Sequence, residues 1–378
     1  MAATIRPLGT DDTDAMAQGF RDAFGSFDPP EPPVPLHAPG KSWWGAEVDG
    51  HLAATALDRD YTSWFGGVRV PTAGIGGVSV VAEHRGEGLL APVFDALHEA
   101  ARERGALIST LFATAPAIYR RWGYESFTSL DRVRVPTAGL AVGGSTPLRR
   151  ADEDDAAAIR AVHDRGVSRR NGPLSRTGPL FAEAPTLRVD GVTVAERDGV
   201  VVGYVAWDRG RGYGEGAELS VHDLEADDTD ALRSLLTMLS TFASTVPSVV
   251  VRTSGIAPWR HLVGRQHATP VSSAPYAITV LDVRAFEVVP APPGLTASLP
   301  FTVDGVTRTL EVADGRTRVV DGGAGGRELT RGGLSLTFAG AHRSADLRLA
   351  GHLDGPDADD AAWDALTLRG PLHVHDYF

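Results

Sequence analysis

Residues 77–90 carry the strongest chemical signal in the sequence. A β-branched run leads into the segment, Arg85, Gly86 and Gly88 follow, and Leu89 opens an apolar stripe. A strand, turn and helix of this kind lets backbone amides approach an anion closely, while the helix dipole and the arginine add positive charge. The segment predicts a diphosphate site, although glycine-bearing turns also occur as plain helix starts.

A second segment, residues 111–124, carries a tyrosine that could act as an acid. It contains Thr114, then Tyr119 in an expected helix, then Tyr124. A tyrosine hydroxyl, with a pKa near ~10, can protonate a leaving thiolate and be reloaded from solvent. On residue type alone, Tyr119 is more often a core residue of a helix, Tyr124 is structural, and Thr114 can cap a helix as well as contact a ligand.

Histidines and aromatic residues alternate at the end of the sequence, from His373 and His375 through Asp376 to Phe378. A terminus of this composition is expected to dock rather than remain loose. His373 and His375 would face the same side of a strand, and with Asp376 they could be metal ligands. Two histidines and a carboxylate at this spacing often occur by chance, and no third ligand is identifiable, so we predict no metal site.

The elements that must position these residues alternate between helix and strand. Residues 11–24 begin with acids and carry apolar side chains at helical spacing, whereas residues 74–81 are a short β-branched run. Residues 88–104 form a one-sided apolar stripe, which is suited to packing on a sheet. The order predicts a mixed α/β sandwich from residue 5 to about residue 136.

The same order of elements returns further along the chain. Strands are expected at residues 192–195, 200–207 and 218–221, and a helix at residues 227–243. We therefore predict two copies of one fold. A proline cluster at residues 288–294 marks a linker to a small α+β unit. The predicted class is therefore α+β, and the predicted domains are residues 1–140, 141–286 and 287–378.

Composition limits the chemistry and the partners. The 378 residues include no cysteine, which excludes disulfides, zinc–thiolate sites and cysteine nucleophiles. The net charge of −12 disfavours nucleic acids and gives weak support to cationic ligands. No apolar run approaches the ~20 residues of a membrane helix, and no signal peptide is visible. We expect no membrane contact and a cytoplasmic location.

Two motifs resemble a known family. Arg85-x-x-Gly88-x-Leu90 resembles the signature (Q/R)-x-x-G-x-(G/A) of the GNAT acetyltransferases except at its last position. Leucine at that position, with histidine before Arg85, resembles the loop of the Eis (enhanced intracellular survival) family of actinobacteria. Residues 118–124 also resemble the I-Y-x-R-(F/W)-G-Y run of that family. The resemblance to Eis covers nearly the whole chain.

The resemblance implies an acetyl-CoA-dependent N-acetyltransferase that needs no metal. It implies that Tyr119 is the general acid and that the α-carboxylate of Phe378 accepts the proton of the amine. The contacts to acetyl-CoA that it implies are made by Val78, Val80, Arg85, Gly86, Gly88, Leu89 and Thr114. The acceptor amine would enter near Ser26, Phe27 and Asp28.

The resemblance also assigns the other two domains. Residues 221–228, read as the turn between strand and helix of the second copy, hold four acids where the first copy has its arginine and glycines. These acids would repel a pyrophosphate, so the second GNAT domain is expected to be degenerate and not to bind CoA. Family resemblance further implies a sterol carrier protein-like third domain and a homohexamer.

The acceptor remains open at this point. An aminoglycoside, a polyamine or a lysine-like small-molecule amine would fit the family. Two alternatives differ in class: a CoA- and lipid-binding protein without turnover, and an acetyltransferase that modifies lysines of proteins. An intact loop at Arg85 and the presence of Tyr119 argue against the binding protein.

Overall fold

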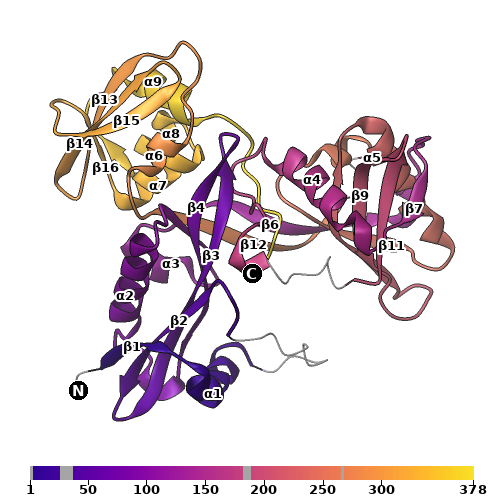
Figure 1. The fold of residues 1–378 in the computed structure, drawn as a ribbon, viewed down its shortest axis with the longest axis horizontal. Helices are drawn as coiled ribbons and strands as arrows, with labels where there is room; N and C mark the ends of the chain where they lie inside the picture. Colours follow the sequence, from indigo (N-terminus) through magenta and orange to yellow (C-terminus); the bar gives the residue numbers. More distant parts are fainter. Residues whose placement is uncertain (1–2, 26–36, 182–188, 265–267) are drawn as a thin grey trace.

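Two sheets organise the protein in the computed structural model, which describes residues 3–25, 37–181, 189–264 and 268–378 (Figure 1). Twelve strands form one continuous sheet, in the order β1-β2-β3-β4-β5-β12-β6-β11-β10-β9-β8-β7. The other sheet has five strands, in the order β15-β14-β13-β16-β17. The α+β class predicted from the sequence is confirmed.

The first half of the large sheet comes from the N-terminal part of the chain. Its elements are β1 (Thr4–Leu8), α1 (Thr13–Phe24), β2 (Lys41–Val48), β3 (His51–Phe65), β4 (Val68–Val80), α2 (Leu90–Glu103), β5 (Ile108–Phe112), α3 (Pro116–Tyr119) and β6 (Glu125–Pro136). Helix α2 packs one apolar face on this sheet through Val93, Phe94, Leu97 and Ala101. The apolar stripe seen in the sequence therefore covers the strands that hold the predicted loop.

The second half of the large sheet repeats this order. Its elements are β7 (Leu148–Arg150), α4 (Ala156–Val167), β8 (Gly191–Arg197), β9 (Val200–Asp208), β10 (Glu218–Ala226), α5 (Thr229–Ser240), β11 (Ser248–Thr253) and β12 (Thr269–Val280). Asp228 caps α5, because its carboxylate accepts from the amides of Asp230 and Ala231.

One strand of the second half lies inside the first. β12 pairs with β5 on one side and with β6 on the other, and β6 in turn pairs with β11. Strands far apart in the sequence therefore alternate at the centre of the sheet. The two halves cannot be separated without exposing the edges of these strands.

The third unit packs beside the first half (Figure 1). It contains α6 (Ala285–Val288), β13 (Ala297–Val303), β14 (Val306–Ala313), β15 (Arg316–Asp321), β16 (Arg327–Leu329), α7 (Arg331–Ala339), α8 (Ser344–Leu349), β17 (Leu353–Asp354) and α9 (Asp360–Thr367). Its core is continuous with that of the large sheet, since Phe338 packs on Phe65 of β3 with ring centroids 5.1 Å apart. From α9 the chain runs back to the middle of the molecule, where it ends.

The interpretation of residues 221–228 as a turn is wrong for most of the segment, because β10 extends to Ala226 and α5 begins at Thr229. The acids at 223 and 225 therefore belong to a strand. Separately, none of the described helices combines the length and the apolar character needed to span a membrane.

Candidate active site

Strands β4 and β5 lie side by side for only part of their length. Their parallel pairing joins residues 72–75 to residues 108–111, whereas β4 continues to Val80. Val78 and Val80 therefore lie beyond the last pair, where β4 still contacts β3. On the side towards β5 the edge of β4 is open, and amides on an open edge are available to a ligand.

A bulge turns β4 away from its neighbour. The register with β3 shifts between Thr55 and Leu57, and Gly77 adopts a left-handed φ of +55° at this place. A Cβ atom on Gly77 would lie 2.4 Å from the ring of Trp43. Both the conformation and the close approach require glycine, so the opening of the strand pair is encoded locally.

The loop after β4 presents unpaired amides. A short 3-10 turn at residues 82–84 is followed by Gly86 and Gly88, whose φ angles are +87° and +77°. No hydrogen bond joins the amides of Gly86, Gly88 or Leu89 to another described residue. Since α2 begins directly afterwards, its positive end adds to these amides and favours an anion.

A cavity of about 300 Å³ lies against this loop. Four of the residues predicted to contact acetyl-CoA line it, namely Val80, Gly86, Gly88 and Leu89. Ile118, Arg121 and Trp122 close the other side, and they come from the segment around Tyr119. Arg121 has no predicted role from the sequence, although its charge and its place within the tyrosine motif could have indicated one.

Arg85 and Thr114 are less directly involved. Arg85 is exposed, and its guanidinium donates to the carbonyl of Asp22 at 2.7 Å and to that of Val80 at 3.3 Å. It thus ties the end of α1 to the end of β4. Thr114 is exposed in the bend between β5 and α3, and its hydroxyl has no hydrogen bond within the described chain.

Tyr119 is the last residue of α3 and is 7% exposed. Its ring lies 5.8 Å from that of Phe94 and 6.2 Å from that of Tyr124, measured between centroids. Burial raises the pKa of Tyr119, because the phenolate would be poorly solvated. The hydroxyl is consequently protonated near neutral pH, as a general acid must be.

Hydrogen bonds of the buried Tyr124 hydroxyl hold the segment that follows Tyr119. Ser109 donates to the carbonyl of Ala73 at 2.8 Å, so it accepts from the Tyr124 hydroxyl at 2.6 Å. Tyr124 in turn accepts from Nε2 of His98 at 2.9 Å. This buried chain joins α2, β5 and β4, and it gives Tyr124 the structural role expected from the sequence.

The last residue reaches the first half of the sheet. The Phe378 ring is half-buried and lies 5.3 Å from Tyr61, 5.4 Å from Phe112 and 6.1 Å from Tyr276. These three residues belong to β3, β5 and β12. The terminus therefore docks at the end of β5. Ser26, Phe27 and Asp28, which the resemblance places near the acceptor, lie outside the described residues.

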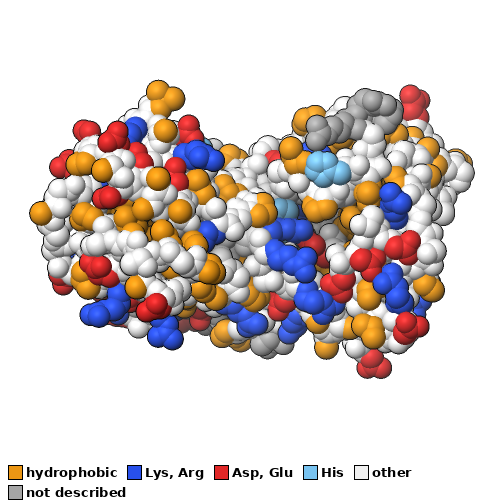
Figure 2. Space-filling model, turned by 90° about the horizontal axis from the view of Figure 1, so that it is seen from above, with side chains coloured by type: hydrophobic (Ala, Val, Ile, Leu, Met, Phe, Trp, Pro, Cys, Tyr) orange, Lys and Arg blue, Asp and Glu red, His pale blue; other side chains and the backbone are white. Residues whose placement is uncertain are grey.

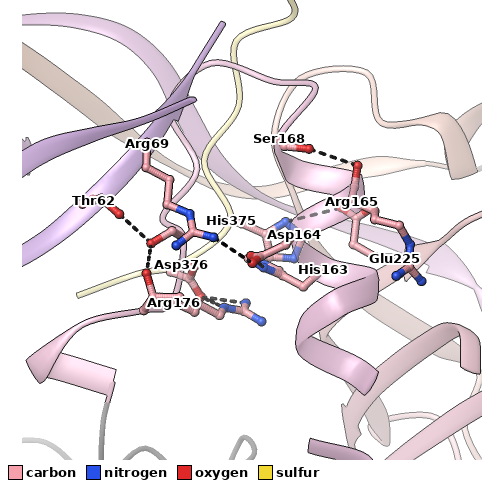
Figure 3. A network of polar contacts seen from close by, with 12 residues as sticks. Thr62, Arg69, His163, Asp164, Arg165, Ser168, Arg176, Glu225, His375 and Asp376 are labelled. Carbon is pink, nitrogen blue, oxygen red and sulfur yellow. Dashed lines mark hydrogen bonds and ion pairs between the residues drawn. The ribbon is translucent and has the colours of Figure 1, made fainter. Parts of the chain in front are cut away.

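Ion pairs hold the residues that precede Phe378 (Figure 3). Arg176 donates to Asp376 at 2.7 Å and to Asp223 of β10 at 2.6 Å. Asp223 also accepts from the Tyr204 hydroxyl at 2.6 Å and from Nε2 of His375. Burial opposes its ionisation, yet the charges of Arg176 and His375 hold the pKa of Asp223 well below its usual value.

The acids of the second half are therefore not an exposed repulsive loop. Besides Asp223, Glu225 is buried and pairs with Arg170, and Asp227 pairs with Arg165 at 2.6 Å. Only Asp228 lies at the start of a helix, and there it caps α5. The second copy lacks the glycine loop, but its acids form the docking surface for the C-terminal residues.

Two segments of the chain match models of known protein families. Residues 4–127 match a model described as an acetyltransferase (GNAT) domain, and residues 172–284 match another with the same description. These two segments therefore belong to the GNAT acetyltransferases, and the chain carries two domains of that family.

More particular relatives include Eis. An uncharacterized N-acetyltransferase of Streptomyces avermitilis is 37% identical over 153 residues, and N-acetyltransferase Eis of Mycobacterium tuberculosis is 28% identical over 149. Each match spans 37% of this chain and 37% of the relative. The crystal structure of a GCN5-related N-acetyltransferase from Kribbella flavida covers 100% of this chain and 99% of its own, with a TM-score of 0.84 and 26% identity. The resemblance to Eis is confirmed.

Proposed function

We propose that the protein transfers the acetyl group of acetyl-CoA to a primary amine of a small molecule. The observation that carries this proposal is the opening between β4 and β5, which leads to unpaired loop amides and a cavity beside a buried, protonated tyrosine. Val78 and Val80 would hold the pantetheine arm. Gly86, Gly88 and Leu89, with Arg85 behind them, would hold the pyrophosphate, and Thr114 would lie near the thioester.

The reaction is a direct transfer. A neutral amine attacks the acetyl carbon, a C–N bond forms, and the C–S bond of the thioester breaks. The amide near Val80 stabilises the oxyanion, Tyr119 gives its proton to the leaving sulfur, and the α-carboxylate of Phe378 accepts the proton of the amine. Because such a carboxylate is a weak base, with a pKa near ~3.5, it acts through water or by attracting the incoming ammonium.

The described charges bear on the choice of acceptor. Arg59 of β3 is half-buried, its guanidinium lies 5.4 Å from the centroid of the Phe378 ring, and its buried Nη1 has no hydrogen bond partner among the described residues. Lys41 of β2 is its partner in the strand register, and burial together with the charge of Arg59 lowers the pKa of Lys41. A polycation would be repelled here, so within the proposal a lysine-like amine is favoured over an aminoglycoside or a polyamine.

Three expectations from the family belong to the same proposal. These are the domain division at residues 140 and 286, a homohexamer in the cytoplasm, and a third unit related to sterol carrier proteins. The five-stranded sheet with α7, α8 and α9 is compatible with such a unit, and lipid binding does not follow from it. A CoA- and lipid-binding protein without turnover remains the competing reading, which the following experiments test.

Replacement of Tyr119 by phenylalanine tests the general acid. We expect kcat to fall by about 10²-fold or more while the KM for acetyl-CoA stays within about threefold, because the hydroxyl acts on the leaving thiolate only in the transition state. Release of free CoA thiol measures both quantities. Tyr213→Phe, at a side chain that is 87% exposed, is the matched control. Unchanged turnover in Tyr119→Phe would remove the tyrosine from the mechanism.

The role of Phe378 is tested by separating its carboxylate from its ring. Phe378→Leu keeps the carboxylate and loses the contacts to Tyr61 and Phe112, whereas a chain ending at Tyr377 moves the carboxylate. If the carboxylate acts on the amine, the shortened chain loses most of its kcat and Phe378→Leu keeps the larger part. Equal losses in both variants would assign Phe378 a packing role only.

A panel of acceptors decides the substrate class. The acceptors spermidine, kanamycin and a lysine peptide, acetylated at its α-amine but with a free ε-amine, are compared by kcat/KM. We expect the lysine peptide to have the highest value. Absence of turnover with every amine, combined with tight binding of acetyl-CoA, would support the binding-protein reading.

A further inference from the structure

The second GNAT copy retains an opening of its own. Strands β10 and β11 pair in parallel only between residues 218–221 and 248–251, and a bulge between Val221 and Asp223 turns β10 aside. This repeats the arrangement of β4 and β5. Beyond the last pair lies a cavity of about 240 Å³. It is lined by Leu224, Glu225 and Ala226 of β10, Arg252 and Thr253 of β11, and His373 and His375 of the C-terminal segment, among others.

Three potential donors converge at this cavity. Nε2 of His373 lies 3.3 Å from Nδ1 of His375, and that Nδ1 lies 3.8 Å from Oε1 of Glu225. The ligand atoms of the three residues all lie within 4.8 Å of one another, and all three side chains are buried. Separations of this size are close to those between the ligands of one tetrahedral ion.

The rings of both histidines also have partners outside the three-residue cluster. Nε2 of His375 bonds with the carboxylate of Asp223, which is itself fully buried (Figure 3 shows the arrangement of His375 and Glu225). The His373 ring has the backbone of Ser254 as its second partner. Metal-binding histidines are usually oriented in this way, by a carboxylate on one ring and a carbonyl on the other. Nε2 of His373 and Nδ1 of His375 share a hydrogen bond, so a bound metal would replace the proton between them.

We propose that Glu225, His373 and His375 form a binding site for one divalent transition-metal ion, with Zn²⁺ the best fit. Two imidazoles and one carboxylate are a ligand set that suits Zn²⁺, and the cavity leaves a fourth position for water. The absence of cysteine makes this a nitrogen and oxygen site. The sequence suggested His373 and His375 but could not supply Glu225, which lies far away in the chain and arrives through β10.

The surrounding charges are mixed. Arg170 pairs with Glu225, and Arg169 and Arg252 line the same cavity. Figure 2 shows Lys and Arg side chains gathered beside a His near the middle of one face of the molecule. Asp223 and Asp376 pair with Arg176, and their charges also act on Arg252. A carboxylate oxygen that accepts from an arginine keeps a lone pair for a metal. The arginines make a bound phosphate the rival occupant.

A metal here would fasten the C-terminal segment to the second GNAT copy. His373 and His375 belong to the last six residues, which also include Asp376 and Phe378. The backbone amide of His373 already donates to the carbonyl of Asn171 at 2.9 Å. The site would thus join the third unit, the second copy and the terminus through one ion. Its role is structural, because it lies on the second copy and not beside Tyr119.

The test is metal binding by the full chain, without a histidine tag and stripped with a chelator. Co²⁺ serves as a spectroscopic probe and Zn²⁺ as the ion for calorimetry. We expect one ion per chain, visible absorption bands typical of four-coordinate Co²⁺, and a rise in Tm with one equivalent of Zn²⁺. Glu225→Gln and His373→Gln should lower the affinity by at least the roughly 10–100-fold that loss of a supporting contact costs.

His222→Gln is the matched control, because His222 lies on the same strand as Glu225 and pairs with Asp208 at 2.8 Å without a third donor. It should bind Zn²⁺ like the unaltered chain. Circular dichroism of the metal-free variants shows whether each is folded. Sub-stoichiometric binding, or equal affinity in His373→Gln, overturns the proposal. A rise in Tm with inorganic phosphate that depends on Arg252, without a response to Zn²⁺, would make the cavity an anion site instead.

Discussion

At the scale of single residues, burial sets the protonation states around the candidate active site. Tyr119 keeps its proton because its phenolate would be desolvated, and the same effect keeps His98 neutral on the other side of Tyr124. The tyrosine motif identified Tyr119 from the sequence. His98 could not be found in that way, since its importance depends on a hydrogen bond to a residue on another element.

His98 predicts how stability depends on pH. Burial lowers the pKa of His98 to about 3, below the ordinary value of 6.5, so protonation favours the unfolded chain. Above pH 6.5 His98 is neutral in both states and does not reduce the free energy of unfolding. As the pH falls from 6.5 towards 3, the unfolded chain takes up a proton that the folded chain does not, and the free energy of unfolding decreases. Between pH 7 and pH 5, we expect the unaltered chain to lose about 2 kcal/mol more unfolding free energy than His98→Gln. Urea titrations at the two pH values measure this, and parallel losses in both chains would contradict the assignment.

At the scale of elements, the segment from the bulge in β4 to α2 is encoded locally in the sequence, whereas the extent of β10 depends on distant residues. The strand, the glycine loop and α2 follow one another in the sequence, and their periodicity and glycines predicted them well. The extent of β10 was missed, because acids at residues 223 and 225 suggested a turn. Their partners, Arg176, Arg170 and His375, are distant in the chain, and these contacts allow the acids to be buried in a strand.

Gly77→Ala tests the bulge. Its left-handed φ costs about 1 kcal/mol for alanine, and contact of the new Cβ with Trp43 adds about 1–3 kcal/mol, so we expect a loss of about 2–4 kcal/mol and weaker binding of acetyl-CoA. Gly50→Ala is the control, because its φ is +79° with no atom within 4 Å of a Cβ. It should lose about 1 kcal/mol and keep its affinity for acetyl-CoA. Equal effects in denaturation and calorimetry would show that Trp43 adjusts freely.

At the scale of the whole molecule, the exchange of β6 and β12 joins both GNAT domains in one sheet. The duplication was visible in the sequence as a repeated order of elements. The exchange was not, because a strand's periodicity carries no information about which neighbour it pairs with. Continuity of the sheet implies that the two domains unfold together.

Leu236→Ala probes this coupling from the core of the second domain. Leu236 is fully buried on α5, so we expect a loss of about 2–5 kcal/mol. Unfolding in urea is followed by tryptophan fluorescence and, for the first domain, by binding of acetyl-CoA. Both transitions should occur at the same urea concentration, which is lower than in the unaltered chain. Leu349→Ala, at a side chain that is 89% exposed, should leave both transitions in place. Retention of acetyl-CoA binding beyond the fluorescence transition would show that the domains unfold independently.

The exchanged strand also bears on how a gene of this kind can change. A deletion that removed the second copy would remove β12, and β5 and β6 of the first copy would then face each other across a missing strand. A copy without the glycine loop therefore still supplies a strand to the sheet of the other copy. After duplication and strand exchange, the second half can lose its original chemistry and acquire another. Its deletion, however, would remove a strand from the sheet of the first half.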